Sequence, residues 1–346
     1  MPLHPRRTVV TATATALLAL AVTACGGGAS DEGNDKGKLR IRIAYQAIPN
    51  ADLVVKNQRL LEKALPEAEI RWVKFDSGGD VNTAVIAGSV DLGLIGSSPV
   101  TKGLSAPLNI PYKVLWIHDV IGDNEALVAK KEFGSVQDLK GRKIAAPFGS
   151  TAHYSLLAAL ESAGLKASDV NLIDLQPQDA LAAWQRGDID AAYVWTPSLT
   201  ELQKDGKVLV TSRQIGAQGK PTADLGIVTN AFAERHPEAV DAWLSAEDQA
   251  VKLAKSDPAK AAASIGAELN LKPEEAQKQL AQLVLLTAKE QRAPAYLGTP
   301  GAPGALAGNL RDAAEFLKGQ KAVDAVPDLT VFEKALAVEE LSRVAG

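Results

Sequence analysis

The sequence has little of the chemistry that metal sites and many enzymes use. Its 346 residues include one cysteine, four histidines and 5% aromatic residues. A disulfide framework needs pairs of cysteines, and a zinc site needs clustered cysteines and histidines. The chain also has no nucleophile elbow and no phosphate-binding loop. We therefore expect no metal, no cofactor and no enzymatic activity, although two-lobed enzymes keep a catalytic alternative open until product formation is tested.

A strong charge of one sign is also missing. The formal net charge is only −4, and the basic residues are dispersed along the chain. A nucleic-acid-binding domain concentrates Lys and Arg on one face. The composition therefore gives no support to a nucleic-acid partner. We expect the protein to be a monomer.

No apolar run is long enough to span a membrane. Arg6 and Arg7 precede small and apolar residues over positions 9–22, a stretch that is interrupted by Thr. A membrane-spanning helix needs about 20 predominantly apolar residues, so residues 1–24 are predicted to be a signal peptide. The two arginines leave open whether export uses the general or the twin-arginine route.

The end of this segment, Val22-Thr23-Ala24-Cys25, resembles the bacterial lipobox. In that motif the Cys becomes the lipidated first residue of the mature protein. We expect Cys25 to anchor an exported lipoprotein to the outer face of the cell membrane, the alternative being an ordinary signal peptide with an incidental Cys. Residues 25–38 hold no hydrophobic residue larger than Ala after Cys25, which predicts a flexible tether.

Beyond the tether, short segments rich in Val, Ile and Leu alternate with segments of helical spacing. This alternation is typical of mainly parallel sheets flanked by helices, that is, an α/β fold. The predicted strands cover residues 39–43, 70–75, 91–95, 112–117, 126–129, 143–147, 170–175, 191–195, 208–211 and 225–229.

Capping residues and prolines mark the predicted helices. Helices are expected from Asp80 to Gly88, over residues 135–139 and from Ser150 to Gly164. Later helices begin near Pro237, Pro258 and Pro273. In the first of them, Val240, Trp243, Leu244, Val251 and Ala254 predict an apolar stripe that only Glu247 interrupts.

The folded part is long enough for two lobes. The chain is predicted to cross between them near residues 121–125 and near Asp224. Residues 39–121 and 225–346 would then form lobe 1, with a helical C-terminal part, and residues 122–224 would form lobe 2.

Several sequence blocks follow one another in a characteristic order. They are Ala44-Tyr45-Gln46, Lys74-Phe75-Asp76-Ser77-Gly78, Gly96-Ser97-Ser98-Pro99, residues 139–145, residues 153–160, Leu175-Gln176-Pro177, residues 182–195 and residues 204–209. In this order the blocks resemble the taurine-binding members of the nitrate, sulfonate and taurine binding family of bacterial ATP-driven importers. The resemblance implies a two-lobed periplasmic-binding-protein fold of type II that closes on a ligand in the cleft. It also implies two partners, an ABC permease and its ATPase.

A sulfonate is a weakly basic anion that needs convergent hydrogen-bond donors, and helix N-termini supply them. Ser97 and Ser98 follow one predicted strand, while Ser150 and Thr151 follow another at the equivalent turn of the second lobe. One anion could bridge both turns. The alternative is that each turn only caps its own helix.

Asp224 is predicted to determine whether the site prefers an aminated sulfonate over an unsubstituted one. In the family that the chain resembles, the acidic residue at this crossing pairs with the ammonium of taurine, and a buried carboxylate without a cation is costly. A solvated turn Asp is the alternative. An unsubstituted aliphatic sulfonate or another small zwitterion remains the competing ligand.

Further candidates lie at predicted strand and helix ends. Gln46 follows the first strand at a position that faces the cleft in open α/β sheets. Trp195 would offer an indole N–H and a ring face, with core packing as its alternative. His153 and Tyr154 stand in the first turn of a helix and would either line the ligand or pack. Gly226, in place of a bulkier residue, is expected to reshape one wall of the site.

Overall fold

The computed structural model describes residues 38–345. The predicted signal peptide, Cys25 and nearly all of the tether lie outside the described residues. Within residues 38–345, no helix combines the length and apolar character that crossing a membrane requires.

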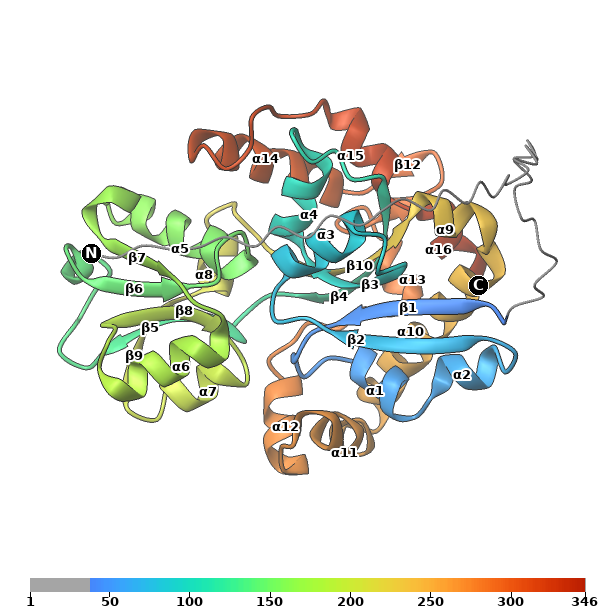
Figure 1. Cartoon of the computed structure of the whole chain (residues 1–346), viewed down its shortest axis with the longest axis horizontal. Coiled ribbons are helices and arrows are strands. Elements are labelled where there is room, and N and C mark those ends of the chain that lie inside the picture. The colour runs from blue at the N-terminus through green and yellow to red at the C-terminus, as the bar shows by residue number, and fades with distance from the viewer. Residues whose placement is uncertain (1–37, 346) are drawn as a thin grey trace, which may run out of the picture. The chain divides into compact units, whose positions relative to one another are not determined.

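The first of two five-stranded sheets has the order β2-β1-β3-β10-β4 (Figure 1). Its strands are β2 (Glu69–Lys74), β1 (Arg40–Tyr45), β3 (Leu92–Gly96), β10 (Ala223–Thr229) and β4 (Tyr112–Val120). β1 pairs in parallel with β2 and β3, whereas β10 is antiparallel to both β3 and β4. Four strands therefore run in one direction and β10 runs against them.

The second sheet, drawn in green in Figure 1, has the order β7-β6-β8-β5-β9. Its strands are β7 (Asn171–Asp174), β6 (Lys143–Ala146), β8 (Ala191–Trp195), β5 (Glu125–Lys130) and β9 (Gly206–Thr211). β6 is parallel to β7 and β8, and β5 is antiparallel to β8 and β9. The predicted strands and the mainly parallel α/β class are thus confirmed.

The antiparallel strands β5 and β10 determine which side chains lie together at one edge of each sheet. Because each runs against its neighbours, it begins at the edge where the neighbours end. Glu125, the first residue of β5, lies opposite Trp195 at the end of β8. Asp224, the second residue of β10, lies opposite Gly96 at the end of β3 and Asp119 near the end of β4. Side chains from distant parts of the sequence therefore share one edge of each sheet.

Helices flank both sheets. The second sheet is accompanied by α5 (Thr151–Ser162), α6 (Pro177–Arg186), α7 (Ser198–Leu202), α8 (Ser212–Ala217) and the short turns η1 (Gln137–Leu139) and η2 (Ala167–Asp169). The remaining helices are α1 (Asp52–Asn57), α2 (Leu60–Ala64), α3 (Gly78–Ile86), α4 (Ser97–Leu104), α9 (Asn230–Arg235), α10 (Pro237–Ser256), α11 (Pro258–Leu269), α12 (Pro273–Leu280), α13 (Ala288–Gln291), α14 (Leu306–Gly319), α15 (Leu329–Ala335) and α16 (Val338–Val344). A small hairpin joins β11 (Gly298–Thr299) to β12 (Ala302–Pro303).

The predicted prolines begin helices as expected, since Pro237, Pro258 and Pro273 each occupy the first turn of α10, α11 and α12. The predicted helix over residues 135–139 is wrong. Only the three-residue 3-10 turn η1 forms there. The carboxylate of Asp138 accepts hydrogen bonds from the backbone N–H groups of Gly134 and Ser135, which holds the segment as a local turn.

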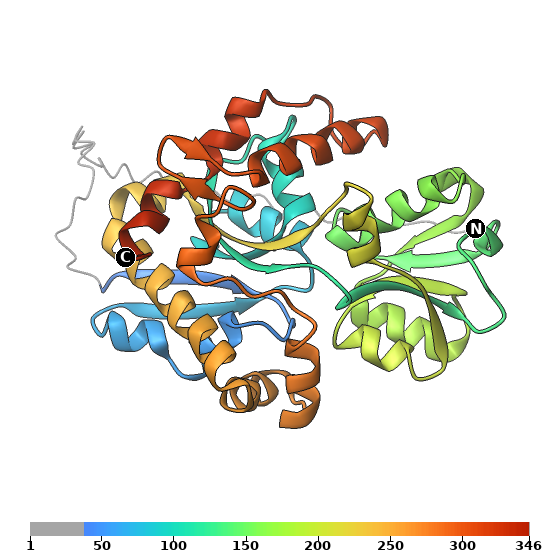
Figure 2. The same cartoon turned by 180° about the vertical axis from the view of Figure 1, so that it is seen from behind.

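The apolar stripe of α10 packs into the large core beside the first sheet, and Figure 2 shows this helix lying across the back of that sheet. Glu247 interrupts this stripe and is itself fully buried. The expectation for Gly226 is wrong. A Cβ at this position would lie 2.4 Å from Cη2 of Trp243 and 3.0 Å from Cβ of Trp116, so the residue faces the core.

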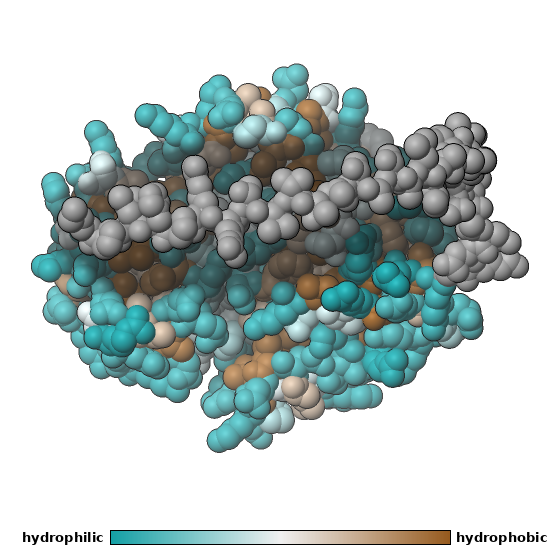
Figure 3. Space-filling view, in the orientation of Figure 1, coloured by the Kyte–Doolittle hydropathy of each residue, from teal (hydrophilic) through white to brown (hydrophobic). Residues whose placement is uncertain are grey.

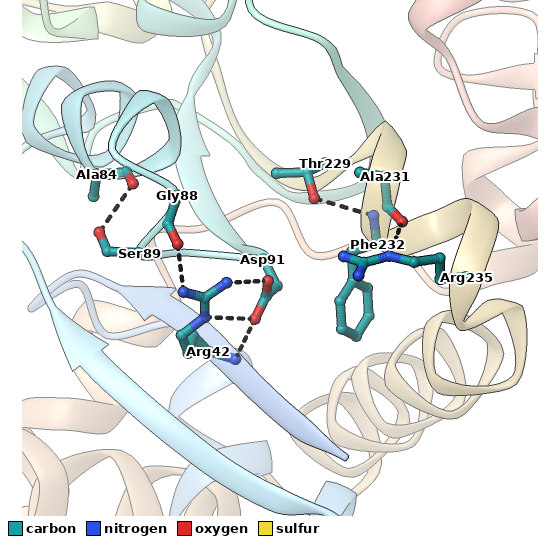
Figure 4. Close-up of polar contacts among 9 residues, drawn as sticks. All are labelled: Arg42, Ala84, Gly88, Ser89, Asp91, Thr229, Ala231, Phe232 and Arg235. Carbon is teal, nitrogen blue, oxygen red and sulfur yellow. Dashed lines mark hydrogen bonds and ion pairs between the residues drawn. The ribbon is translucent and has the colours of Figure 1, made fainter. Parts of the chain in front are cut away.

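An ion pair fastens β1 to the turn that precedes β3 (Figure 4). The guanidinium of Arg42 donates to both carboxylate oxygens of Asp91, at 2.9 and 2.6 Å, and also to the carbonyl oxygen of Gly88. The backbone N–H of Arg42 donates to Asp91 as well, at 2.9 Å. Charge-assisted, bidentate contacts of this kind fix the position of β3 and of the helix that follows it.

Hydrophilic side chains cover most of the coloured surface in Figure 3. Within residues 38–345, the exposed large hydrophobic side chains are Ile86, Phe148, Val284, Leu329 and Val331. The chain passes between the two sheets through residues 121–124 and 218–222. Residues 38–345 lie in one compact unit, and the division into two lobes stays a prediction.

Candidate functional site

A cleft lies where the carboxyl ends of the parallel strands meet the starts of β5 and β10. Its lining residues are Gln46, Ile48, Gly78, Gly96, Pro99, Ile121, Asn124, Glu125, Ser150, Thr151, Trp195 and Asp224. Ligands of open α/β sheets bind at this edge. Five of the predicted site residues are among them: Gln46, Ser150, Thr151, Trp195 and Asp224.

Three helix N-termini border the cleft. Gly78 begins α3, Gly96 and Pro99 belong to the start of α4, and Ser150 and Thr151 lie at the start of α5. The first backbone N–H groups of a helix have no partner within the helix, and the helix dipole adds positive potential there. The cleft can therefore receive an anion without a basic side chain.

Ser150 uses its own hydroxyl as a helix cap. Its Oγ accepts a hydrogen bond from the N–H of His153 at 3.1 Å and donates to the carbonyl of Pro147 at 2.6 Å. The ring of His153 stacks on Phe148 with 4.5 Å between ring centroids, and its Nδ1 accepts from the N–H of Gly149. Burial lowers the pKa of His153 to about 4, so the ring is neutral near pH 7. Of the two, only Ser150 lines the cleft.

Ser97, Ser98 and Tyr154 line a second cavity instead. The side chains around them are mostly apolar, among them Ile117 and Leu310, and none of the described residues that line this cavity is charged. The hydroxyl of Ser97 accepts a hydrogen bond from the N–H of Ala223 at 3.1 Å, which ties α4 to β10 beside Asp224. The structure thus divides eight of the predicted residues between two spaces, while His153 lines neither, and of these two spaces only the cleft has charged lining residues.

Glu125 is the residue of the cleft that the sequence analysis missed. Its carboxylate is 1% exposed and accepts hydrogen bonds from the hydroxyls of Thr151 and Ser212, each at 2.6 Å, and from that of Ser155 at 3.5 Å. Burial raises its pKa to about 7, and the negative charge of Asp224 acts in the same direction. The hydroxyl of Thr151 is therefore directed toward a carboxylate.

Asp224 lies next to a second acidic residue, Asp119, its register partner on β4. Asn50 donates to Oδ1 of Asp119 at 3.0 Å, whereas Oδ2 has no donor. Burial raises the pKa of Asp224 to about 6, and raises that of Asp119 well above its usual range, the charge of Asp224 adding to the effect.

Asp52, at the start of α1, extends this acidic group. It is 2% exposed, neither carboxylate oxygen has a side-chain donor, and burial raises its pKa to about 8. The sequence did carry a signal for these groups. Asp119 and Glu125 each stand near the end of a strand whose central residues are apolar, which places their carboxylates next to the core but does not show which residues they meet.

Among the described residues that line the cleft, none is basic. Within residues 38–345 there is also no cluster of His, Cys, Asp and Glu that could hold a metal ion. A buried carboxylate is costly unless a cation or a proton neutralises it. The cleft thus combines carboxylates that favour a cation with helix ends that favour an anion, and a zwitterion satisfies both.

A two-sheet α/β fold with a cleft at the strand ends is shared by the substrate-binding proteins of solute importers, and the matched family places this chain in that class. This chain belongs to the family described as the substrate binding domain of ABC-type glycine betaine transport systems, whose model matches residues 40–279.

Individual relatives carry more specific names. The chain is 44% identical over 205 residues to the taurine-binding periplasmic protein of Escherichia coli, a match that covers 59% of this chain and 63% of that protein. It is 32% identical over 216 residues to a putative aliphatic sulfonates-binding protein of the same organism, covering 62% of this chain and 67% of the relative. These matches confirm the resemblance on which the sequence analysis relied.

The fold has a solved counterpart in the alkanesulfonate-binding protein of Xanthomonas axonopodis pv. citri, bound to MOPS. The TM-score is 0.70 at 24% identity, over 86% of this chain and 97% of that one. The predicted periplasmic-binding-protein fold is thereby confirmed, and the matched family and these relatives are binding proteins.

Proposed function

We propose that this protein captures taurine, 2-aminoethanesulfonate, and delivers it to an ABC permease and its ATPase. The observation that carries the proposal is Asp224, a buried carboxylate in a cleft that no basic side chain of residues 38–345 lines. The ammonium of taurine would neutralise this carboxylate. The sulfonate would then accept hydrogen bonds from the N-termini of α4 and α5. The taurine-binding relative supports the same ligand.

Within this proposal the predicted site residues keep distinct roles. The side-chain amide of Gln46 and the indole of Trp195 border the ligand, while Ser150 and Thr151 present the start of α5. Ser97, Ser98, His153 and Tyr154 support the helix ends from outside the cleft. We also propose that the protein acts as a monomer.

The alternative ligand is an unsubstituted aliphatic sulfonate or another small zwitterion. The putative aliphatic sulfonates-binding relative favours the first, and the glycine betaine family description favours the second. An unsubstituted sulfonate would leave Asp224 without a cation, at a cost of several kcal/mol or of protonation. A quaternary ammonium could offer charge to Asp224 but no N–H donor.

Calorimetric titration of the protein with taurine, ethanesulfonate and glycine betaine tests the proposal, with glycerol as a neutral control. Taurine should bind at least about 10-fold more tightly than ethanesulfonate, because only taurine offers Asp224 a charged donor. Equal affinity for ethanesulfonate, or tighter binding of glycine betaine, would overturn the assignment of taurine.

We further propose that a lipid on Cys25 tethers the exported protein to the membrane. The lipobox-like sequence Val22-Thr23-Ala24-Cys25 supports this. After cell fractionation the wild-type protein should sediment with membranes and Cys25→Ser should not. Sedimentation of both would contradict lipidation at this residue.

A further inference from the structure

We propose that Glu125 is a second counter-charge for the cation of the ligand, so that the ammonium lies between Glu125 on β5 and Asp224 on β10. This inference rests on the proposed function and adds a specificity-determining residue to it. The cation would link the two sheets, because each carboxylate belongs to a different one.

The placement of the two carboxylates carries the argument. Both line the same cleft, and both stand where the chain has just crossed between the sheets: Glu125 directly after residues 121–124, and Asp224 after residues 218–222. Each lies at the start of the strand that runs against its neighbours, Glu125 as the first residue of β5 and Asp224 as the second of β10, so both stand at the ligand-binding edge. A cation held by both would fix the relative position of the two crossing segments.

The groups that surround the Glu125 carboxylate are neutral or acidic, so none of those described below supplies it with a positive charge. Hydroxyls of Thr151 and Ser155 on α5 and of Ser212 on α8 donate to it, and the hydroxyl of Tyr193 on β8 lies 3.0 Å from that of Ser212. These groups are neutral. The charged or titratable groups that act on Glu125 across the cleft are the acidic Asp224 and Asp119. A ligand cation is the missing neutralising group.

The competing explanation gives Glu125 a purely structural task, that of joining α5 and α8 to β5 through its three hydroxyl contacts. The two explanations differ in one measurable respect. A structural Glu125 supports the binding of any ligand equally, whereas a counter-charge supports only a cationic one. The test therefore compares taurine with isethionate, 2-hydroxyethanesulfonate, in which a hydroxyl replaces the ammonium.

The test is a calorimetric titration of wild type and Glu125→Gln with both ligands. Glu125→Gln should lower the affinity for taurine by about 10- to 100-fold, the range of a charge-assisted hydrogen bond, and that for isethionate by less than about 3-fold. Glu132→Gln, which removes an exposed carboxylate just beyond β5, should change neither affinity. Equal losses for the two ligands would overturn the proposal.

The pH dependence of the wild-type protein gives a second readout that needs no variant. Ligand ammonium selects the ionised carboxylates, so taurine affinity should rise with pH through about 6 to 7, where Asp224 and Glu125 lose their protons. Isethionate affinity should not rise. If the Glu125→Gln variant folds, its taurine affinity should rise less with pH than that of the wild-type protein. A flat taurine profile between about pH 5.5 and 8 contradicts the proposal, whereas no taurine binding by wild type would contradict the proposed function itself.

Discussion

At the scale of single residues, the unusual feature is how many carboxyl groups are buried without a cation. Asp52, Asp119, Glu125, Asp224 and Glu247 are all at most 5% exposed. Asp224 and Glu125 line the cleft, where a ligand can neutralise them. Glu247 lies deeper, in the core, and depends on a proton instead.

Glu247 therefore predicts a pH-dependent stability. Neither of its oxygens has a hydrogen-bond partner, and the nearby His118 stays neutral because burial lowers its pKa to about 3. Burial raises the pKa of Glu247 well above its usual range. The unfolded chain then binds fewer protons than the folded one above about pH 4.5, so the stabilising contribution is present at low pH and declines as pH rises, by up to about 1.4 kcal/mol per pH unit.

Glu247→Gln should remove this decline. In urea unfolding, the variant should gain stability relative to wild type at pH 8, and the gain should shrink toward pH 5. Glu234→Gln, at an exposed position of the neighbouring helix α9, is the control and should show no such trend. A gain that is the same at both pH values would mean that Glu247 is not protonated in the folded protein.

At the scale of elements, the strands and the later helices could be predicted from the sequence and the site only in part. Alternating apolar segments and helix-starting prolines reflect local physics, so β1 to β10 and α10 to α12 appear where expected. The meeting of Glu125 with Thr151, or of Asp224 with Asp119, depends on strand order and direction. No local pattern encodes the reversal of β5 and β10, and for this reason Glu125 was missed.

A substitution at Ser150 tests whether its hydroxyl caps α5 or contacts the ligand. Ser150→Ala removes the hydrogen bond from the N–H of His153 and should cost about 1 kcal/mol of folding stability. Taurine affinity should change by less than about 3-fold, because the hydroxyl of Ser150 already donates to Pro147. Urea unfolding and titration measure the two quantities.

Ser150→Asn, which retains a capping side chain, should recover most of the stability. A Ser150→Ala variant of unchanged stability that has lost taurine binding would show that the hydroxyl acts on the ligand.

At the scale of the whole molecule, the two sheets supply complementary halves of one site. The helix ends give positive potential without basic side chains, and the reversed strands give carboxylates from each sheet. We propose that this arrangement favours a small zwitterion over an anion. Both carboxylates lie beside the segments in which the chain crosses between the two sheets. In this proposal Asp224 is the residue that makes the site prefer a zwitterion over an anion.

The most direct test of that claim is the titration of Asp224→Asn with taurine and ethanesulfonate. Taurine affinity should fall by about 10- to 100-fold, whereas ethanesulfonate should bind as well as before or better, because the uncompensated carboxylate is gone. Asp188→Asn, at an exposed position, serves as the control and should leave both affinities unchanged. An Asp224→Asn protein that still prefers taurine as strongly as wild type does would contradict the account.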